Sequence, residues 1–122
     1  MESIEAKVRK YLLSLGFIPN KCGYRFLFDI ITDGLRGKTI LPLKFEAYTR
    51  LAAKYARSVD SVEKDIQNAI SAAWLTGDIG MLYSEFGETI DMRKGKPSNK
   101  HFILTAIEKL SHSATSVAAR RM

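Results

Sequence analysis

The stretch that decides the fold is LAAKYARSVDSVEKDI, residues 51–66. Two short apolar patterns flank a polar hinge that contains neither Gly nor Pro. Leu51 and Tyr55 lie on the inward face of a first predicted helix. Val62 and Ile66 begin a second apolar stripe with steps of three and four residues, as expected for one face of a helix. That stripe continues with Ala69, Ile70, Ala73 and Trp74. The stretch therefore predicts two packed helices joined by a short turn.

The hinge has the spacing of a helix-turn-helix. In that motif the second helix crosses the first after a turn of three or four residues, here Ala56–Val59. We expect Asp60 to cap the second helix and Glu63 to complete a capping box. A helical hairpin in an ordinary bundle predicts the same spacing, so spacing alone leaves both interpretations open.

The composition indicates one soluble globular domain. The chain has 122 residues, of which 46% are hydrophobic, including six Phe, five Tyr and one Trp. That content is enough for a single core and is unlike the composition of disordered chains. The formal net charge is +6, which suits a polyanionic partner but is also common in proteins without one.

The single cysteine and the absence of a long apolar run predict a cytoplasmic location. Cys22 cannot form an internal disulfide, which suits a reducing compartment. Without a histidine partner in the sequence, we expect it to be a small core residue. No run approaches the roughly 18 apolar residues of a membrane span, and the N-terminus does not resemble a signal peptide.

Apolar periodicity and breakers predict an all-α fold of about six helices. Ser98 is a candidate N-cap for the last helix. We expect residues 1–112 to form a single helical domain and residues 113–122 a flexible basic tail. The predicted helices span residues 3–15, 24–35, 43–56, 60–76, 81–86 and 99–110.

The polar face of the predicted helix 60–76 has side chains suited to reading bases. If this helix lies in the major groove, its N-terminal residues meet base edges. Glu63 can accept from cytosine, Lys64 can donate to guanine, and Gln67 can read adenine. Ser61 and Asn68 lie on the same polar face as Lys64, with Glu63 and Gln67 to one side of it. A solvated helix face with several acids remains the alternative.

Phosphate contacts are expected from two other groups of residues. Arg50, Lys54, Arg57 and Ser58 lie nearer the DNA backbone, where they would position the domain without reading sequence. The loop before the last helix is the densest basic region and supplies the second group. That group consists of Lys94, Lys96 and Ser98. A solvated charge run is the alternative for this loop.

Three longer stretches resemble a known family. They are LGFIPNKCGYRFLFDII (15–31), LAAKYARSVDSVEKDIQNAISAAWLTGDI (51–79) and FGETIDMRKGKPSNKHFI (86–103). In order and spacing they are similar to the C-terminal DNA-binding effector domain of the stage-zero sporulation response regulator A family of endospore-forming Firmicutes. The segments KPSNKHFI and SAAWLTGDI are the most specific.

This resemblance implies an all-helical, winged-helix-like effector domain that regulates transcription. It implies binding to duplex DNA at short boxes related to TGTCGAA, often as dimers on tandem sites, with helix 60–76 as the recognition helix. It also implies contact with RNA polymerase sigma factor through residues near Gly77–Ser84. The family's main member also has a receiver domain, so this chain is expected to be either an excised effector domain or a stand-alone protein.

The residues that match the family's recognition helix depart from its pattern. Glu63 matches the family's glutamate, whereas Lys64 and Gln67 stand where the family has two arginines. Lysine cannot reproduce the bidentate fork of arginine on guanine, and glutamine favours adenine. Asp65 adds a negative charge where the family has a small apolar residue. We therefore expect an altered DNA target.

Two other classes of function compete with DNA binding. The substitutions in the recognition helix are also consistent with a protein-interaction module that keeps the fold but has lost or changed base reading. An enzyme is disfavoured because the sequence has no P-loop, no nucleophile motif and no metal-ligand spacing. His101 is expected at the surface, and His112 lies near the tail. We expect no catalytic residue, metal site or cofactor.

Overall fold

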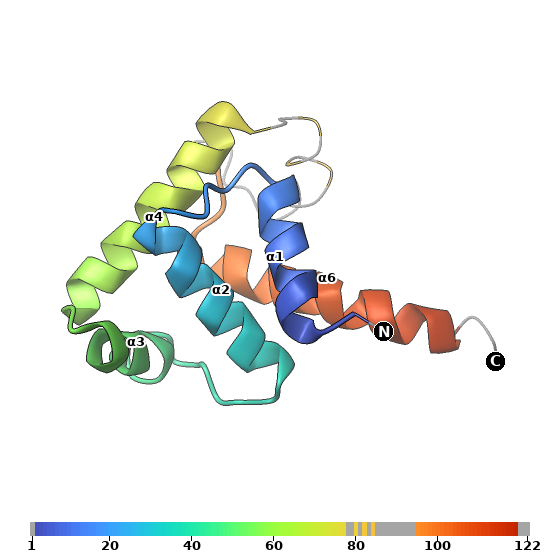
Figure 1. Ribbon diagram of the computed structural model, residues 1–122, viewed down its shortest axis with the longest axis horizontal. Helices are drawn as coiled ribbons and strands as arrows, with labels where there is room; N and C mark the ends of the chain where they lie inside the picture. The colour runs from blue at the N-terminus through green and yellow to red at the C-terminus, as the bar shows by residue number, and fades with distance from the viewer. Residues whose placement is uncertain (1, 78–79, 81, 83, 85–94, 120–122) are drawn as a thin grey trace.

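The computed structural model describes residues 2–77, 80, 82, 84 and 95–119, and their side chains up to Ser111. This part of the chain is helical and contains no strand, which confirms the all-α prediction (Figure 1). None of its helices is long and apolar enough to cross a membrane. The helices are α1 (Ile4–Ser14), α2 (Cys22–Leu35), α3 (Ala47–Tyr55), α4 (Val59–Thr76) and α6 (Asn99–Ala119).

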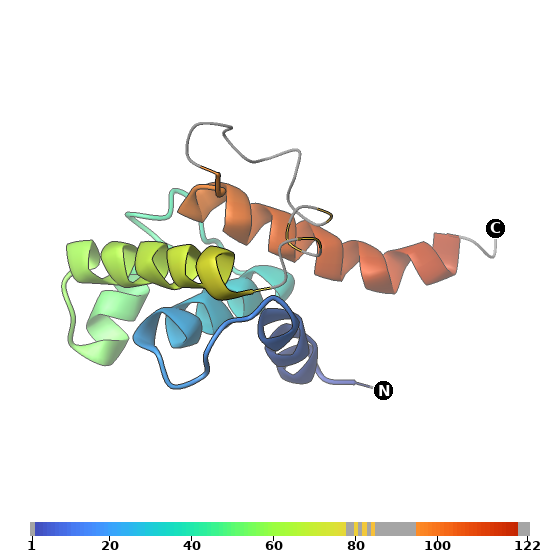
Figure 2. The same cartoon turned by 90° about the horizontal axis from the view of Figure 1, so that it is seen from above.

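Helix α2 lies at the centre and packs against α1, α4 and α6 (Figures 1 and 2). Its apolar residues point to several sides, which explains why Phe26, Leu27 and Ile30 are all at most 2% exposed. Gly23 in its first turn allows α4 to approach closely. A Cβ at this position would lie 2.5 Å from the Cβ of Ala69 and would also overlap the backbone carbonyl of Asp65.

The first helices start and stop close to the predicted positions. Ser3 caps α1, because its hydroxyl accepts a hydrogen bond from the Ala6 amide at 3.1 Å. Gly16 follows the helix with a φ of 98°, a conformation that favours glycine. Helix α2 starts at Cys22, two residues earlier than the expected Tyr24.

The start predicted for the third helix, Leu43, was wrong. Helix α3 begins at Ala47, and residues 43–46 form a turn. In that turn the Tyr48 amide bonds to the Leu43 carbonyl at 2.7 Å. This bond reaches back five residues rather than four, so the segment does not follow the α-helical pattern.

The cap predicted for α4 was also wrong. Ser58 is the N-cap, and its hydroxyl accepts from the Ser61 amide at 3.0 Å. Asp60 is therefore already inside the first turn, where its carboxylate favours the positive end of the helix dipole. The capping box expected between Asp60 and Glu63 does not form, because the helix starts one residue earlier.

Helix α6 is longer than expected. It starts at Asn99 as predicted, and Ser98 is its cap, with the His101 amide donating to the serine hydroxyl at 3.2 Å. It continues to Ala119, past the predicted end at Leu110. The division of the chain at residue 113 stays a prediction. The helix expected over residues 81–86 lies largely outside the described residues, although Leu82 is buried in the core.

Candidate nucleic-acid interface

Helices α3 and α4 form the expected helix-turn-helix. Three residues, 56–58, join them. Ala56 adopts a left-handed conformation with a φ of 55°, and the Arg57 amide bonds to the Ala52 carbonyl at 2.9 Å. This alanine thus takes the position that glycine usually occupies at a helix end. Figure 1 views α3 nearly end-on while α4 runs across the picture, so the two helices cross steeply.

The buried stripe of α4 is the predicted one. Val62, Ile66, Ile70 and Ala73 are at most 1% exposed. The opposite face projects outward, and each of its central residues is one helical turn from the next. That outward face is formed by Asp60, Lys64, Asn68 and Leu75, all exposed, together with the half-buried Ser61 and Ser71.

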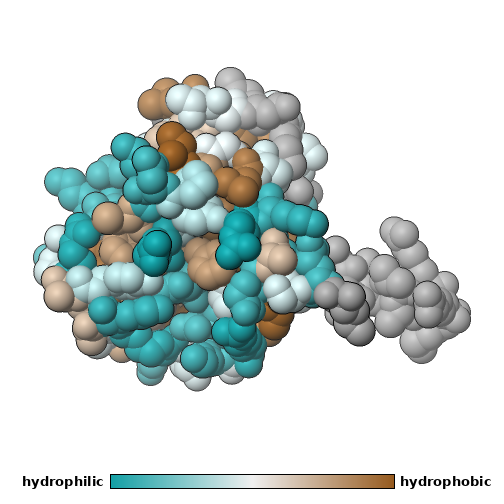
Figure 3. Space-filling model, viewed as in Figure 1, coloured by the Kyte–Doolittle hydropathy of each residue, from teal (hydrophilic) through white to brown (hydrophobic). Residues whose placement is uncertain are grey.

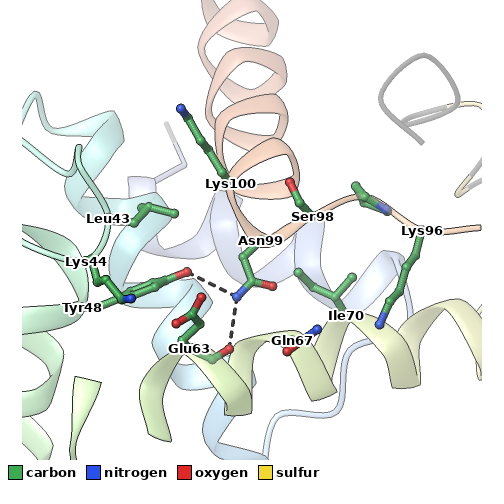
Figure 4. Close-up of a pocket in the computed structure, with 11 residues that line it drawn as sticks. Leu43, Lys44, Tyr48, Glu63, Gln67, Ile70, Lys96, Ser98, Asn99 and Lys100 are labelled. Carbon is green, nitrogen blue, oxygen red and sulfur yellow. Dashed lines mark hydrogen bonds between the residues drawn. The ribbon is translucent and has the colours of Figure 1, made fainter. Parts of the chain in front are cut away.

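The structure divides the predicted base-reading residues into two groups. Lys64, Asn68 and Ser61 lie on or beside the outward face of α4. Glu63 and Gln67 instead line a cavity on one flank of the helix. Figure 4 shows the Glu63 side chain directed toward Tyr48 and Asn99 rather than away from the domain. The two groups therefore approach a ligand from different sides of α4.

This flank cavity lies between α4, the turn before α3 and the N-terminus of α6 (Figure 4). Its volume is about 390 Å³. The Asn99 side-chain amide donates to the Tyr48 hydroxyl at 3.3 Å and to the Glu63 carbonyl at 3.1 Å, so one side chain joins three helices. The cavity is lined by Leu43, Lys44, Tyr48, Glu63, Gln67, Ile70, Lys96, Pro97, Ser98, Asn99 and Lys100.

The ionisation of Tyr48 reflects this environment. Burial raises the pKa of the Tyr48 hydroxyl above its ordinary value, and the nearby Glu63 carboxylate adds to the increase. The hydrogen bond from Asn99 acts in the opposite direction but is outweighed. Tyr48 is therefore a neutral hydroxyl in the wall of the cavity at physiological pH.

Two cations predicted to contact phosphate are held in ion pairs with α2. Arg50 lies 3.4 Å from the Asp33 carboxylate and donates to the Thr39 carbonyl at 2.8 Å. Lys54 lies 3.0 Å from the Asp29 carboxylate, and this hydrogen bond raises the pKa of Lys54. Both cations therefore help to anchor α3 to α2, and their charges face carboxylates of the same chain.

Arg57 is paired as well, and it contacts the single cysteine. Its guanidinium lies 2.5 Å from the Asp65 carboxylate and donates to the Cys22 sulfur at 3.5 Å. The prediction that Cys22 belongs to the core was wrong, since the residue is exposed at the start of α2. The buried positions of α2 are occupied instead by larger side chains, such as that of Phe26.

The structure describes two of the three residues in the second set predicted to contact phosphate. Ser98 and Lys96 line the flank cavity, and the Lys96 ammonium contacts the Ser71 hydroxyl of α4. Lys94 lies outside the described residues. His101 is exposed, as expected.

Sequence reasoning missed Lys44 and Asn99 as members of this site, and it placed Lys100 in the basic loop without assigning it a contact. Asn99 and Lys100 belong to the KPSNKHFI motif, which could have pointed to them. Lys44 has no such signal, because it reaches the cavity only through folding.

The comparison with known families agrees with this arrangement. A family model described as "Sporulation initiation factor Spo0A C terminal" matches residues 8–110. The match includes α2, α3, α4 and the start of α6, so it covers both the helix-turn-helix and the flank cavity. The expected resemblance is confirmed, and the family is one of DNA-binding regulator domains rather than enzymes. The chain belongs to the sporulation initiation factor Spo0A C-terminal family and is a DNA-binding domain of a sporulation transcription factor.

Proposed function

We propose that this domain binds duplex DNA sequence-specifically, with α4 in the major groove. The observation that carries the proposal is the outward face of α4, on which Asp60, Lys64 and Asn68 are exposed. B-DNA has a major groove about 12 Å wide, which admits one α-helix. A helix presented in this way by a helix-turn-helix is the usual reader of base edges.

The roles of the base-reading residues follow from their positions. Lys64, exposed one turn into α4, donates to the guanine acceptors, and Asn68 forms a bidentate pair with adenine one turn later. Ser61 donates to a base or phosphate near the start of the helix. Gln67 reads adenine from the edge of the flank cavity. Glu63 accepts from cytosine after its side chain turns out of that cavity.

Phosphate contacts by the cations of α3 and of the turn that follows it must compete with their ion pairs. Arg50, Lys54 and Arg57 each face an aspartate of this chain. In the proposed complex they position the domain on the backbone, and each gains less from a phosphate than an unpaired cation would. Ser58 caps α4 through its oxygen and keeps a hydroxyl proton that it can donate to a phosphate.

The test is equilibrium binding of the purified domain to duplexes, across a salt series. Selection from random duplexes identifies the preferred sequence, and a scrambled duplex measures non-specific binding. Lys64→Gln and Asn68→Ala are expected to reduce the preference by about 1–3 kcal/mol per base contact. Failure of the unmodified domain to bind any duplex at low salt would leave the alternative, a protein-interaction module.

Contact with RNA polymerase sigma factor is proposed for the end of α4 and the residues that follow it, 77–84, of which 78, 79, 81 and 83 lie outside the described residues. Leu75 in the last turn of α4 is 83% exposed, and Ile18 in the loop before α2 is 48% exposed. Figure 3 shows hydrophobic residues gathered toward the C-terminal end of α4, on a face that is otherwise mostly hydrophilic. Leu75→Ser should weaken binding to purified sigma factor more than it weakens binding to DNA, because Leu75 lies in the last turn of α4, away from the N-terminal residues that meet base edges.

Dimer formation on tandem sites is the remaining proposal. Sedimentation with duplexes that have one or two selected boxes tests it. The proposal requires two domains to bind the duplex with two boxes more tightly than two independent sites would.

A further inference from the structure

The flank cavity concentrates positive charge beside the recognition helix. Lys44 reaches it from the turn before α3, Lys96 from the segment before α6, and Lys100 from the first turn of α6. None of the three forms an ion pair with a carboxylate in the part of the chain that the structure describes. Glu63 is the one carboxylate among the lining residues. Three lysines against one glutamate leave the cavity net positive.

Hydrogen-bond donors complete the cavity. Ser98 accepts a bond from the His101 amide, so its hydroxyl proton remains available to an incoming oxygen. Lys96 contacts Ser71, which in turn donates to the Gln67 carbonyl at 3.0 Å. Asn99 ties the floor of the cavity to α4 through the Glu63 carbonyl. These hydrogen bonds therefore fix the positions of the donors relative to the recognition helix α4.

The position of the cavity matches the wall of a DNA groove. When the outward face of α4 points at base edges, the flanks of the helix face the sugar-phosphate strands on either side. Glu63 and Gln67 lie on one flank, next to the cavity. The pocket on the other flank is lined by two cations, Lys21 and Arg57, and by Asp65, which pairs with Arg57, so its excess of positive charge is smaller. The two flanks thus differ in their attraction for phosphate.

We propose that the flank cavity binds one backbone phosphate of the DNA strand beside α4. Lys44, Lys96 and Ser98 hold the phosphate oxygens, and Lys100 stands at the rim. In Figure 4 the Lys96 ammonium points toward α4, while Lys100 extends away from it on a flexible stem that can turn toward the rim. This inference rests on the proposed DNA binding and adds the site that sets the register of α4 in the groove.

The experiment compares the wild-type chain with the double variant Lys44→Gln/Lys100→Gln. Both side chains are exposed, so the fold should tolerate the changes. Loss of one phosphate contact should make the slope of log K against log[salt] shallower by about 0.9, and should shrink the affinity ratio between 50 and 200 mM salt about threefold. Affinity should fall equally for selected and scrambled duplexes, whereas Lys64→Gln should change their ratio.

A matched control is Lys7→Gln/Lys10→Gln, which removes the same charge from α1. It is expected to keep the wild-type slope, and thermal melts of all variants check folding. An equal slope for both double variants would overturn the inference. That outcome differs from failure of the proposed function, in which the wild-type chain itself binds no duplex.

Single neutral methylphosphonate substitutions locate the phosphate. At one backbone position, the substitution should weaken the wild-type chain but have little further effect on Lys44→Gln/Lys100→Gln, because both changes remove the same contact. Equal effects on the two chains at every position would contradict the inference. Titration with inorganic phosphate, followed by amide NMR, tests the other source of this ligand. Saturable binding of free phosphate without any change in DNA salt slope would make the cavity a small-anion site instead.

Discussion

Gly23 is the position where one methyl group should move the recognition helix. In Gly23→Ala the new Cβ would overlap the Asp65 carbonyl and lie 2.5 Å from the Cβ of Ala69. The carbonyl belongs to the backbone of α4, so the contact can be relieved only by shifting α4 away from α2. Overpacking of this kind costs about 1–3 kcal/mol. The same replacement gains up to about 1 kcal/mol of helix propensity.

Gly34→Ala in the same helix is the matched control. Its Cβ would meet the terminal methyl of Ile107, which can rotate away, and it gains similar propensity. The difference between the two variants therefore isolates the steric cost at Gly23. An unfolding entropy of about 2.1 cal/mol/K per residue gives roughly 4 °C per kcal/mol for this chain.

The assay is thermal unfolding of both variants by circular dichroism. Gly23→Ala should melt about 4–12 °C below Gly34→Ala, the range that follows from 1–3 kcal/mol. It should also lose discrimination between selected and scrambled duplexes, because α4 shifts relative to the flank cavity. Equal melting temperatures for the two variants would refute the reasoning, since they would mean that α4 accommodates the methyl without moving.

Four further substitutions test the caps and the buried tyrosine. Ala56→Gly should raise the free energy of unfolding by about 1 kcal/mol, because alanine is strained in the left-handed conformation; an unchanged urea midpoint would contradict this. Ser58→Ala should lower the same quantity by about 0.5–2 kcal/mol through loss of the N-cap, and Asp60→Ala should cost less in the same measurement. The raised pKa of Tyr48 gives stability that is fully present below its ordinary value of 10.0 and is lost as the pH rises through the higher folded pKa. Tyr48→Phe should therefore make the fall in urea stability between about pH 9 and about pH 11 shallower, and an unchanged fall would exclude Tyr48 as a cause.

The helices could be predicted from sequence because their signals are local. The stripe Val62, Ile66, Ile70 and Ala73 depends only on 3.6 residues per turn, and all four residues are buried as expected. The start of α4 was missed by one residue because Ser58 and Asp60 are both good N-caps. Only the backbone conformation at Ser58 decides between them.

The ion pairs could not be predicted from the sequence. Arg50, Lys54 and Arg57 looked like one row of phosphate contacts, yet each faces an aspartate. Two of these aspartates, Asp29 and Asp33, come from α2, and they meet α3 only after the helices pack. Such pairing depends on the distance between the two charges in space, because their electrostatic attraction weakens with separation and with screening by salt. Cys22 was misplaced for the same reason, since exposure of an apolar residue is set by its neighbours in three dimensions.

By itself the sequence determined the helical class and the family, because periodicity and motif order are properties of neighbouring residues, whereas turn spacing alone left a helix-turn-helix and an ordinary helical hairpin both open. The tertiary structure decided which polar side chains share a site. It placed Glu63 and Gln67 beside Lys44, Lys96 and Lys100, which come from segments far apart in the chain. Helical periodicity already predicts that Glu63 and Gln67 lie to one side of Lys64 and Asn68, but only the packing of the turn before α3 and of α6 against that side makes it a cavity.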